Sequence, residues 1–516
     1  MGAEYVAQDL MTRFFSIDDF ESLKDGKGDA LINVKQEKNQ PMQPDTPEKP
    51  VLAMQQLLDS QHAAFQLNPM PSAGQRKGHL RRLSSALKAS RHRLAEAIDL
   101  DFNGRSRDET LLAEIYPSLE GIRYAANHVS RWMRPDRRQV GLIFQPARAR
   151  VLYQPIGVVG VISPWNYPVY LTIGPLTGAL AAGNRVMIKA SEYTPNTTQT
   201  LREMLAGVFA DDHVSVVTGD ADVAAAFSGL DFDHLLFTGS TAVGRHVMRA
   251  AAGNLTPVTL ELGGKSPVLV APGYPIDTAA ERIAFGKCFN AGQTCIAPDY
   301  LLCPENRLDA FVKAFSAAVA RLYPTMAANP DYTAIVNQRQ FERLSGYLSD
   351  ARGRGGHLVP VNPSAEAFSD TGKMPVWLVL DPTNAMTVMQ EEIFGPILPV
   401  VTYRKLSEAV DYVNGRPRPL ALYYFDEDKK RTQSVLNQTR SGGVCINDTL
   451  AHVAQDDLPF GGIGQSGMGA YHGETGFLTF SKARPVFTRG RLNSTRLAWP
   501  PYGRRIHRWL YRFLLR

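Results

Sequence analysis

The segment on which the fold assignment rests runs from Thr259 to Cys295. It opens with Thr-Leu-Glu-Leu-Gly-Gly-Lys at residues 259–265 and closes with Asn-Ala-Gly-Gln-Thr-Cys at residues 290–295. It offers one carboxylate, Glu261, and one thiol, Cys295, each set in a bend that contains glycine, which permits backbone angles that other residues avoid. A thiol attacks carbonyl carbon well only as the thiolate, and a carboxylate can take a proton from water. The pair therefore predicts covalent acyl chemistry followed by hydrolysis.

Five further motifs extend the pattern along the chain. They are Pro164-Trp165-Asn166-Tyr167-Pro168, Phe237-Thr238-Gly239-Ser240-Thr241, Glu391-Glu392-Ile393-Phe394-Gly395-Pro396, Pro459-Phe460-Gly461-Gly462 and Ser466-Gly467-Met468-Gly469-Ala470-Tyr471-His472-Gly473. In content, order and spacing the chain from about residue 60 to about residue 485 resembles the aldehyde dehydrogenase superfamily. The last motif, with Asn447-Asp448, is similar to the branch that contains the dimeric class 3 and coniferyl aldehyde dehydrogenases.

The resemblance implies an α/β fold with a Rossmann-type cofactor domain, an α/β catalytic domain and a small β arm for oligomerisation. The chain itself supports two α/β units. Residues 185–189, 214–217 and 234–237 read as strands that alternate with helical segments, and the alternation resumes after Gly264 with strands at 268–270 and 300–303. This βαβ rhythm predicts parallel sheets with helices on both faces. Asp277 is the expected cap of the helix that follows the strand at 268–270.

From these patterns we expect four parts. They are an N-terminal extension, flexible at least in part, over residues 1–55; a cofactor-binding domain over 56–262, with 139–156 contributing to the oligomerisation arm; a catalytic domain over 263–462; and a C-terminal segment over 463–516 with dimer contacts and a basic tail.

The residues between Arg150 and Arg185 carry no charged side chain, and the segment is long enough to span a bilayer. It also contains four prolines and five glycines, which would break a spanning helix repeatedly. We expect instead a buried strand at 157–162, a polar loop and a buried helix near 171–182. Loops at strand ends are where open α/β sheets place their ligands.

Composition excludes several classes of protein. With 44% hydrophobic and 21% charged residues, the chain is not disordered in bulk, and its 516 residues suggest two or three domains. Four cysteines are too few for a disulfide scaffold, which favours a reducing, cytoplasmic location. Residues 485–516 contain eight arginines and no Asp, Glu or Lys, so the net charge of +6 leaves −2 (6 − 8) for residues 1–484. Nucleic-acid binding by the enzyme body therefore has no support.

The resemblance assigns the chemistry to three residues. Cys295 is the expected nucleophile, and the alternative is a buried structural thiol. The Asn166 side-chain amide and the Cys295 backbone N–H are expected to stabilise the thiohemiacetal oxyanion; without the resemblance, Asn166 would be only a turn residue. Glu261 is the expected base that activates water against the thioester, and its pKa should be raised by desolvation beside Leu260 and Leu262. Its alternative is a surface acid at a strand end.

The cofactor is expected to be NAD, with NADP as an alternative, and no metal is expected. No G-x-G-x-x-G follows the first strand of the sheet, but Gly239 and Ser240 lie at a strand-to-helix turn, where free backbone N–H groups can hold pyrophosphate. By resemblance, Glu192 and Lys189 lie at the adenine-side ribose, where Glu192 would repel a 2′-phosphate; a surface ion pair is the alternative. The other cofactor residues expected from the resemblance are Trp165, Glu392 and Phe394, and for Phe394 core packing is the alternative.

Three residues are expected to line the substrate tunnel: Tyr167, His452 and Phe460. An aromatic wall would suit an aromatic or long apolar aldehyde. No cationic residue stands out that would hold the carboxylate of a semialdehyde. For His452 a structural role is an equal alternative.

The end of the chain has a pattern of its own. Residues 504–516 place Ile506, Trp509, Leu510, Phe513 and Leu514 on one helical face, with arginines off that face. Such a helix could lie on the anionic inner face of a membrane, or pack against its own body or a partner subunit. The branch implies a homodimer, with contacts near residues 140–153 and after about residue 480.

Three functions follow from these observations. The first is an NAD(P)-dependent aldehyde dehydrogenase that acts through a Cys295 thiohemiacetal and thioester on aromatic, coniferyl-type or apolar aliphatic aldehydes. The second is a cysteine-dependent esterase or thioesterase without a redox step. The third is a non-catalytic structural or membrane-bound member of the family, against which the intact Cys295, Glu261 and Asn166 argue.

Overall fold

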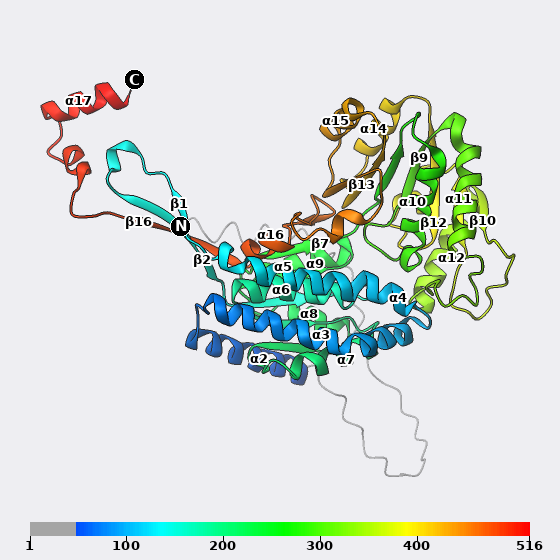
Figure 1. Ribbon diagram of the computed structural model, residues 1–516, viewed down its shortest axis with the longest axis horizontal. Coiled ribbons are helices and arrows are strands. Elements are labelled where there is room, and N and C mark those ends of the chain that lie inside the picture. The colour runs from blue at the N-terminus through cyan, green and yellow to red at the C-terminus, as the bar shows by residue number, and fades with distance from the viewer. Residues whose placement is uncertain (1–47, 516) are drawn as a thin grey trace, which may run out of the picture. The chain divides into compact units, whose positions relative to one another are not determined.

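The computed structural model describes residues 48–515. Residues 1–47 of the expected N-terminal extension lie outside the described residues, whereas 48–55 belong to helix α2 (Glu48–Leu67). Two large sheets and a three-stranded arm organise the described chain (Figure 1). None of the helices in 48–515 combines the length and the apolar character that crossing a membrane requires.

The first large sheet has the strand order β15-β7-β6-β3-β4-β5. Its strands are β3 (Val158–Ile162), β4 (Arg185–Lys189), β5 (Val214–Val217), β6 (His234–Thr238), β7 (Val258–Glu261) and β15 (Gly467–Met468). All neighbours are parallel except β15, which returns from the C-terminal segment and pairs antiparallel with β7. The strand order reverses between β3 and β6, so the loops that leave these two strands diverge and open a crevice.

Helices cover both faces of this sheet, as expected for a doubly wound fold. On one face lie α3 (Ala73–Phe102), α5 (Tyr116–Trp132), α6 (Tyr170–Ala182) and α7 (Pro195–Ala206), and on the other lie α2, α8 (Ala221–Ser228) and α9 (Thr241–Ala252). Strand β3 feeds both cores because its side chains alternate: Val159 and Val161 join one cluster, and Val158 and Ile162 join the other.

Helix α6 contains no charged residue, yet buried ions contact both of its ends. At its first turn, Glu114 Oε2 accepts from the backbone N–H groups of Val169 (2.7 Å) and Tyr170 (3.1 Å). At its last turn, Arg76 Nη1 donates to the Ala181 carbonyl (3.1 Å). An anion at the N-terminus and a cation at the C-terminus both match the helix dipole and satisfy backbone groups that the helix leaves free.

The second large sheet has the order β10-β11-β12-β9-β8-β13-β14, and all of its pairs are parallel except β10 with β11. Its strands are β8 (Pro267–Val270), β9 (Tyr300–Pro304), β10 (His357–Val361), β11 (Val376–Leu380), β12 (Ile397–Tyr403), β13 (Ala421–Phe425) and β14 (Gly443–Ile446).

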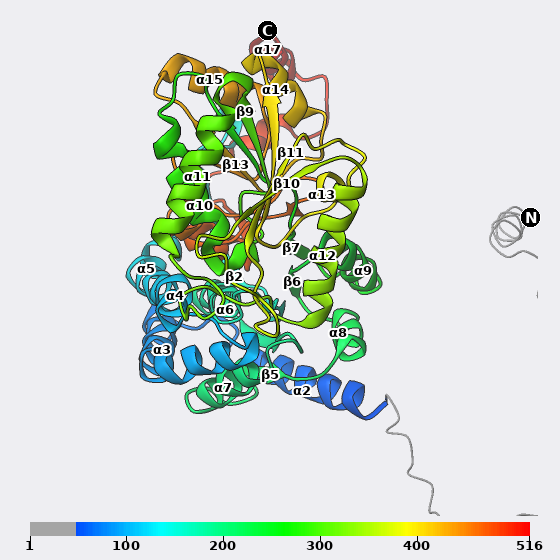
Figure 2. The same ribbon diagram turned by 90° about the vertical axis from the view of Figure 1, so that its right-hand side faces the viewer.

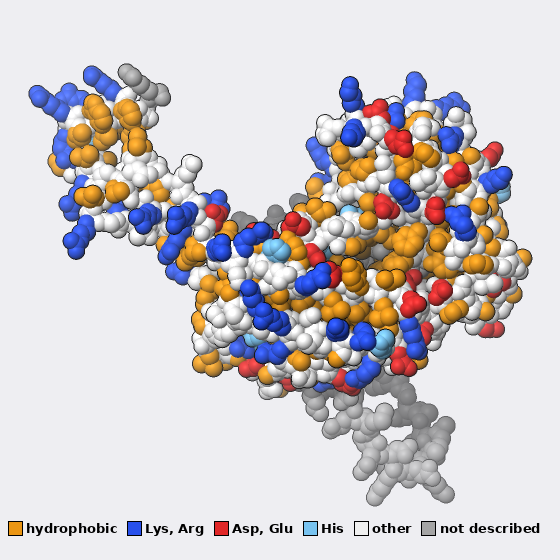
Figure 3. All heavy atoms as spheres, in the orientation of Figure 1, with side chains coloured by type: hydrophobic (Ala, Val, Ile, Leu, Met, Phe, Trp, Pro, Cys, Tyr) orange, Lys and Arg blue, Asp and Glu red, His pale blue; other side chains and the backbone are white. Residues whose placement is uncertain are grey.

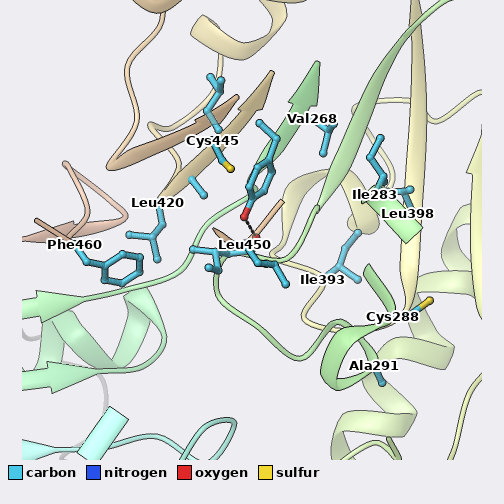
Figure 4. Packing of buried hydrophobic residues seen from close by; sticks show 14 of the residues in the cluster. Val268, Ile283, Cys288, Ala291, Ile393, Leu398, Leu420, Cys445, Leu450 and Phe460 are labelled. Carbon is cyan, nitrogen blue, oxygen red and sulfur yellow. Dashed lines mark hydrogen bonds between the residues drawn. The ribbon is translucent and has the colours of Figure 1, made fainter. Parts of the chain in front are cut away.

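The flanking helices are α10 (Ile276–Cys288), α11 (Leu308–Leu322), α12 (Gln338–Gly353), α13 (Thr387–Gln390), α14 (Leu406–Asn414) and α15 (Lys429–Gln438). Figure 2 shows α10 and α11 on one side of the strands and α12 and α13 on the other. Val268, Ile283 and Leu398 lie in the core that joins them (Figure 4). Asp277 is not the cap of α10: Pro275 precedes the helix, and Asp277 lies in its first turn, where a carboxylate favours the dipole.

The arm is a three-stranded antiparallel sheet of β1 (Asp136–Arg138), β2 (Arg148–Pro155) and β16 (Ser481–Thr488). Residues 142–144, between β1 and β2, contact the short helix η7 (Ser494–Ala498), and α17 (Arg505–Leu514) follows. The remaining short elements are α4 (Arg107–Thr110), η2 (Leu111–Ile115), η3 (Leu142–Phe144), η4 (Phe289–Gly292), η5 (Glu305–Arg307), η6 (Ala451–Ala454) and α16 (Gly473–Thr479).

Candidate active site

A cavity of about 560 Å³ opens where the strand order of the first sheet reverses. The loop after β3 and the turn after β6 line one side of the cavity. The segment that follows α13 and the segment that precedes β13 line the other side. A cavity of this size is within the range of small-molecule and cofactor sites. Eight of the residues expected from the sequence line it: Trp165, Asn166, Gly239, Ser240, Glu261, Cys295, Glu392 and Phe394. Tyr167, Lys189, Glu192, His452 and Phe460 are not among its lining residues.

Cys295 follows the turn η4 and is the one cysteine that is partly exposed; Cys288, Cys303 and Cys445 are buried. Burial raises the pKa of the Cys295 thiol to about 12, and the nearby Glu392 and Glu261 act in the same direction. The backbone N–H groups of Cys295 and Ile296 reach the sulfur and oppose the rise in pKa. The resting side chain is therefore a thiol that has two amide donors in place for the thiolate.

Glu261 ends β7 and is buried at the wall of the same cavity. Neither of its carboxylate oxygens has a hydrogen-bond partner among the described residues. Burial raises its pKa well above the ordinary value of 4.5. A buried carboxyl without partners is costly, so it marks a place where a ligand or a reacting water is expected to bind.

The loops that carry Asn166 and Cys295 are bonded to each other. Asn166 Nδ2 donates to the Gln293 carbonyl (3.1 Å), and Asn290 Nδ2 donates to both the Asn166 carbonyl (3.0 Å) and the Gln293 carbonyl (3.1 Å). The Tyr167 hydroxyl lies 2.7 Å from Thr294 Oγ1. Asn290 and Ala291 both have φ of 50°, a region that L-residues seldom occupy. The turn before the thiol is therefore held against its own conformational preference by these contacts.

A buried ion cluster contacts these loops, and its position was not predicted from the sequence. It consists of Arg105, Glu109 and Glu114, which come from the segment between α3 and α5. Arg105 and Glu109 are four residues apart, which is the one local pattern that could suggest an ion pair. Exposed ion pairs on helices have the same spacing, so the pattern does not indicate burial.

The turn after β6 has the geometry of an anion site. Ser240 caps α9 and accepts from Val243 N (3.3 Å), so the free N–H groups of the first turn face the cavity. Thr238 Oγ1 is buried without a hydrogen-bond partner among the described residues, and so is Glu392 Oε1. Phe394 packs edge-on against Trp165 with ring centroids 5.3 Å apart.

Two groups of expected residues lie away from the cavity lining. Lys189 ends β4, where its Nζ donates to the Ala190 carbonyl (2.7 Å) and lies 3.8 Å from Glu192 Oε2. On the other side, Phe460 stacks with His472 (5.3 Å between centroids) and lies 6.3 Å from the His452 ring. Neither ring nitrogen of His452 has a hydrogen-bond partner in the described chain, and burial lowers its pKa to about 4.

Comparison with known sequences gives a consistent result. The aldehyde dehydrogenase family matches residues 34–486. A probable coniferyl aldehyde dehydrogenase of Pseudomonas aeruginosa is 59% identical over 463 residues, which cover 90% of this chain and 96% of the relative. A coniferyl aldehyde dehydrogenase of a Pseudomonas species is 49% identical over 435 residues, covering 84% of this chain and 90% of the relative.

Solved structures agree. AldH of Staphylococcus aureus in its substrate-bound state superposes with a TM-score of 0.85 at 37% identity, covering 89% of this chain and 99% of that one. The indole-3-acetaldehyde dehydrogenase AldA of P. syringae, in complex with NAD+ and IAA, has a TM-score of 0.78 at 25% identity, covering 85% and 89%. With a family match over most of its length and relatives that are 59% and 49% identical over more than four fifths of the chain, the chain belongs to the aldehyde dehydrogenase family and is an oxidoreductase that acts on the aldehyde group.

Proposed function

We propose that this protein oxidises coniferyl-type aromatic aldehydes to carboxylic acids with NAD, using Cys295 as nucleophile, Asn166 as oxyanion donor and Glu261 as general base. One observation carries the proposal: a thiol, an amide and a buried carboxyl that has no hydrogen-bond partner in the described part of the chain line the same cavity as the helix turn at Ser240. The names of the Pseudomonas relatives support the substrate class.

The cavity fits a dinucleotide. The first turn of α9 offers N–H groups for pyrophosphate, and Glu392 Oε1 is free to accept from a ribose hydroxyl. The Glu392 carboxylate lies against Gly263, where a Cβ atom would collide with it. Glycine at residue 263 therefore leaves room for this carboxylate. We assign the adenine-side ribose to Lys189 and Glu192, which would disfavour a 2′-phosphate; NADP remains the alternative, as in an E. coli NADP-dependent enzyme with 25% identity and a TM-score of 0.78. When bound, nicotinamide supplies the hydride acceptor and a positive charge.

The first half of the mechanism makes a thioester. Cys295 loses its proton, and its sulfur attacks the aldehyde carbon to form a thiohemiacetal. The backbone N–H of Cys295 and the Asn166 Nδ2 group donate to the developing oxyanion, each worth about 3–4 kcal/mol of transition-state stabilisation. Because the pKa of the resting thiol is about 12, this step needs a base or a nearby positive charge. The aldehyde hydrogen would then leave with its electron pair as hydride, for which bound nicotinamide would be the acceptor, and the carbonyl carbon would stay bonded to the Cys295 sulfur as a thioester.

The second half releases the acid. Glu261 takes a proton from a water molecule, and the resulting hydroxide attacks the thioester carbon. The carboxylic acid leaves, and the Cys295 thiolate is restored. A raised pKa suits Glu261 to this role, because a general base works best when its pKa lies near the operating pH.

We propose that the substrate side of Cys295 has an aromatic wall. Tyr167, His452 and Phe460 are our candidates for the wall, and Tyr423, His472 and Tyr471 pack around the latter two. The two unpartnered ring nitrogens of His452 could hydrogen-bond a hydroxyl on an aromatic ring. This polar group in an aromatic setting favours a phenolic aldehyde over a plain aliphatic one.

The test is NADH formation by the purified protein with coniferyl-type, plain aromatic, medium-chain aliphatic and semialdehyde substrates, with NAD and NADP in parallel. Coniferyl-type aldehydes with NAD should give the highest kcat/KM. Hydrolysis of an activated ester without cofactor, and no NADH from any aldehyde, would favour the esterase alternative. The absence of any turnover would favour the non-catalytic alternative.

We propose that the domains follow the sheets, with cofactor binding assigned to residues 56–262, catalysis to 263–462 and the C-terminal segment to 463–516. The short link between β7 and β8, at residues 262–266, supports the first boundary.

Residues 139–156 and β16 form most of the arm, and we propose that the arm joins two copies in a homodimer. The exposed Leu142, Phe144 and Phe487 support this use. Light scattering should give twice the chain mass, and a monomer at micromolar concentration would contradict the dimer.

We propose that the protein is cytoplasmic and that residues 504–516 contact the anionic inner face of a membrane. Figure 3 shows hydrophobic and basic side chains together over α17. Trp509, Phe513 and Leu515 are exposed, and no acidic residue follows residue 485. Deleting residues 504–516 should reduce sedimentation with anionic vesicles and leave binding to neutral vesicles unchanged. Equal sedimentation of both forms would remove the membrane proposal and leave packing against a partner.

A further inference from the structure

The buried cluster of Arg105, Glu109 and Glu114 contacts both catalytic loops. Its side chains have relative exposures of 0%, 6% and 0%. Arg105 Nη1 donates to Glu114 Oε1 (3.0 Å), and Arg105 Nε lies 3.5 Å from Glu109 Oε1. Burial raises the pKa of both glutamates, while the Arg105 charge opposes the rise. Buried charges of this kind stabilise a fold poorly, and apolar residues of the same volume often serve as well.

Arg105 contacts the loop of the oxyanion donor directly. The same Nη1 that binds Glu114 also donates to the Asn166 carbonyl (3.0 Å). The guanidinium lies over the Tyr167 ring, 4.8 Å from its centroid. Through Glu114, which bonds the N–H groups of Val169 and Tyr170, it also holds the start of α6. The loop between β3 and α6 is thus held at two points along its length.

Glu109 contacts the loop of the nucleophile. Its Oε1 accepts from the backbone N–H of Asn290 (3.0 Å), the first of the two residues with φ of 50° before Cys295. Asn290 in turn bonds the Asn166 carbonyl, so Arg105 and Asn290 both donate to the same oxygen. Glu114 lies in the π-helical turn η2, an irregularity that is frequent at functional sites.

We propose that Arg105 is a positioning residue for aldehyde oxidation, which fixes the Asn166 amide relative to the Cys295 thiol by binding the Asn166 carbonyl and, through Glu109, the turn at Asn290. The inference rests on the proposed roles of Cys295 and Asn166. Without the guanidinium, the Asn166 carbonyl loses one donor and Glu109 loses its counter-ion, so the two loops can separate. Misplacement by about 1 Å is enough to reduce the rate of such a reaction about 100-fold.

The experiment compares Arg105→Met and Arg105→Lys with Arg76→Met. Arg76 is a matched control, because it is also fully buried and holds the other end of α6, but contacts neither catalytic loop. Three quantities are measured: the melting temperature, the single-turnover rate of NADH formation with a coniferyl-type aldehyde, and the pH profile of Cys295 alkylation by iodoacetamide, with Cys295→Ala as the blank.

Arg105→Met should lower the single-turnover rate about 100-fold, with an unchanged KM for NAD, and Arg105→Lys should recover part of the loss. The alkylation profile of Arg105→Met should move to higher pH, because the N–H groups of Cys295 and Ile296 no longer face the sulfur. Arg76→Met should lower the melting temperature without either change. If Arg105→Met does not fold, Arg105→Lys and Glu109→Gln carry the test.

The inference is overturned if Arg105→Lys and Glu109→Gln keep the wild-type turnover rate and alkylation profile, or if Arg76→Met loses as much activity as Arg105→Met. Failure of the proposed function has a different signature. The wild type would then form no NADH, while the shift in alkylation would still report whether Arg105 positions the nucleophile.

Discussion

The catalytic cavity and the C-terminal helix α17 each lack contacts that their residues favour, but in opposite ways. In the cavity, four buried polar atoms have no hydrogen-bond partner within residues 48–515: both oxygens of Glu261, one of Glu392 and the hydroxyl of Thr238. In α17, apolar side chains are exposed, with Trp509 at 60% and Phe513 at 56%. In our proposals a few atoms at fixed positions complete the first region, and the negatively charged surface of a membrane, which has no fixed shape, covers the second.

This difference predicts how each region responds to substitution. An interaction made by one buried atom with a reacting group has no substitute, so its loss reduces the rate by orders of magnitude. An interaction shared among several arginines and aromatic side chains is lost in small steps. The predictions below test that contrast, beginning with the residue on which the cavity depends most.

Cys295→Ala should reduce aldehyde oxidation on the order of 10⁶-fold, the effect typical of removing a covalent nucleophile. Without the sulfur no thiohemiacetal can form, whereas the residues proposed to bind the cofactor are unchanged. The check is the steady-state rate of NADH formation, with NAD affinity from fluorescence titration as the control. The substitution Cys445→Ala, at a buried thiol outside the cavity lining, should leave the rate unchanged. Oxidation by Cys295→Ala at near the wild-type rate would refute the mechanism.

Glu261→Gln should reduce the rate of acid release about 10²- to 10⁴-fold, as expected for loss of a general base. The first turnover should persist, so rapid mixing should show a burst of NADH followed by a slow phase. In the wild type, the steady-state rate of NADH formation should decrease as the pH falls through the raised pKa of Glu261, because the protonated carboxyl cannot accept a proton from water. A pH-independent steady state in the wild type would contradict this role.

The same substitution tests whether the unpartnered carboxyl is a cost to the fold. Its pKa in the folded protein lies above the unfolded value near 4.5, so the folded state binds more protons, and stability falls as the pH rises through the folded pKa. Glu261→Gln removes this loss. It should therefore melt at a higher temperature than the wild type at neutral pH, and the difference should shrink as the pH approaches 4.5. Equal melting temperatures throughout would show that the carboxyl has partners in solution.

Asn166→Ala should reduce the single-turnover rate about 10²- to 10³-fold, the typical effect of removing one oxyanion donor. This variant loses the side-chain bond to the Gln293 carbonyl, but the Asn166 backbone carbonyl still binds Arg105 and Asn290 and should hold the loop in place. Asn290→Ala is a useful contrast, since it removes the bond from Asn290 Nδ2 to the Asn166 carbonyl and leaves the Asn166 amide intact. If Asn166→Ala lost no more than tenfold, the oxyanion would have to be stabilised mainly by the Cys295 backbone.

Elements that alternate along the chain and residues that lie in motifs could be predicted from the sequence, whereas contacts that form only on folding could not. Alternating strands and helices gave both large sheets, and the run between Arg150 and Arg185 was correctly predicted as β3, a loop and α6. The return of residues 467–468 as strand β15 beside β7 was missed, since two residues carry no periodicity. The cluster of Arg105 and Glu109 was missed for another reason. Arg105 binds the Asn166 carbonyl and Glu109 binds the Asn290 N–H, both far along the chain, and the sequence does not distinguish a buried arginine from an exposed one.

At α17 the expected effects are the smallest. Arg508→Gln should weaken binding to anionic vesicles about fivefold, since one basic side chain near such a surface is worth about 1 kcal/mol. The rate of aldehyde oxidation should not change, because no residue of 505–514 lines the cavity. Arg81→Gln, at an exposed arginine of α3, is the matched control and should change neither quantity. A loss as steep as that of Asn166→Ala would mean that α17 recognises one defined partner through Arg508, and the contrast between the two regions would not hold.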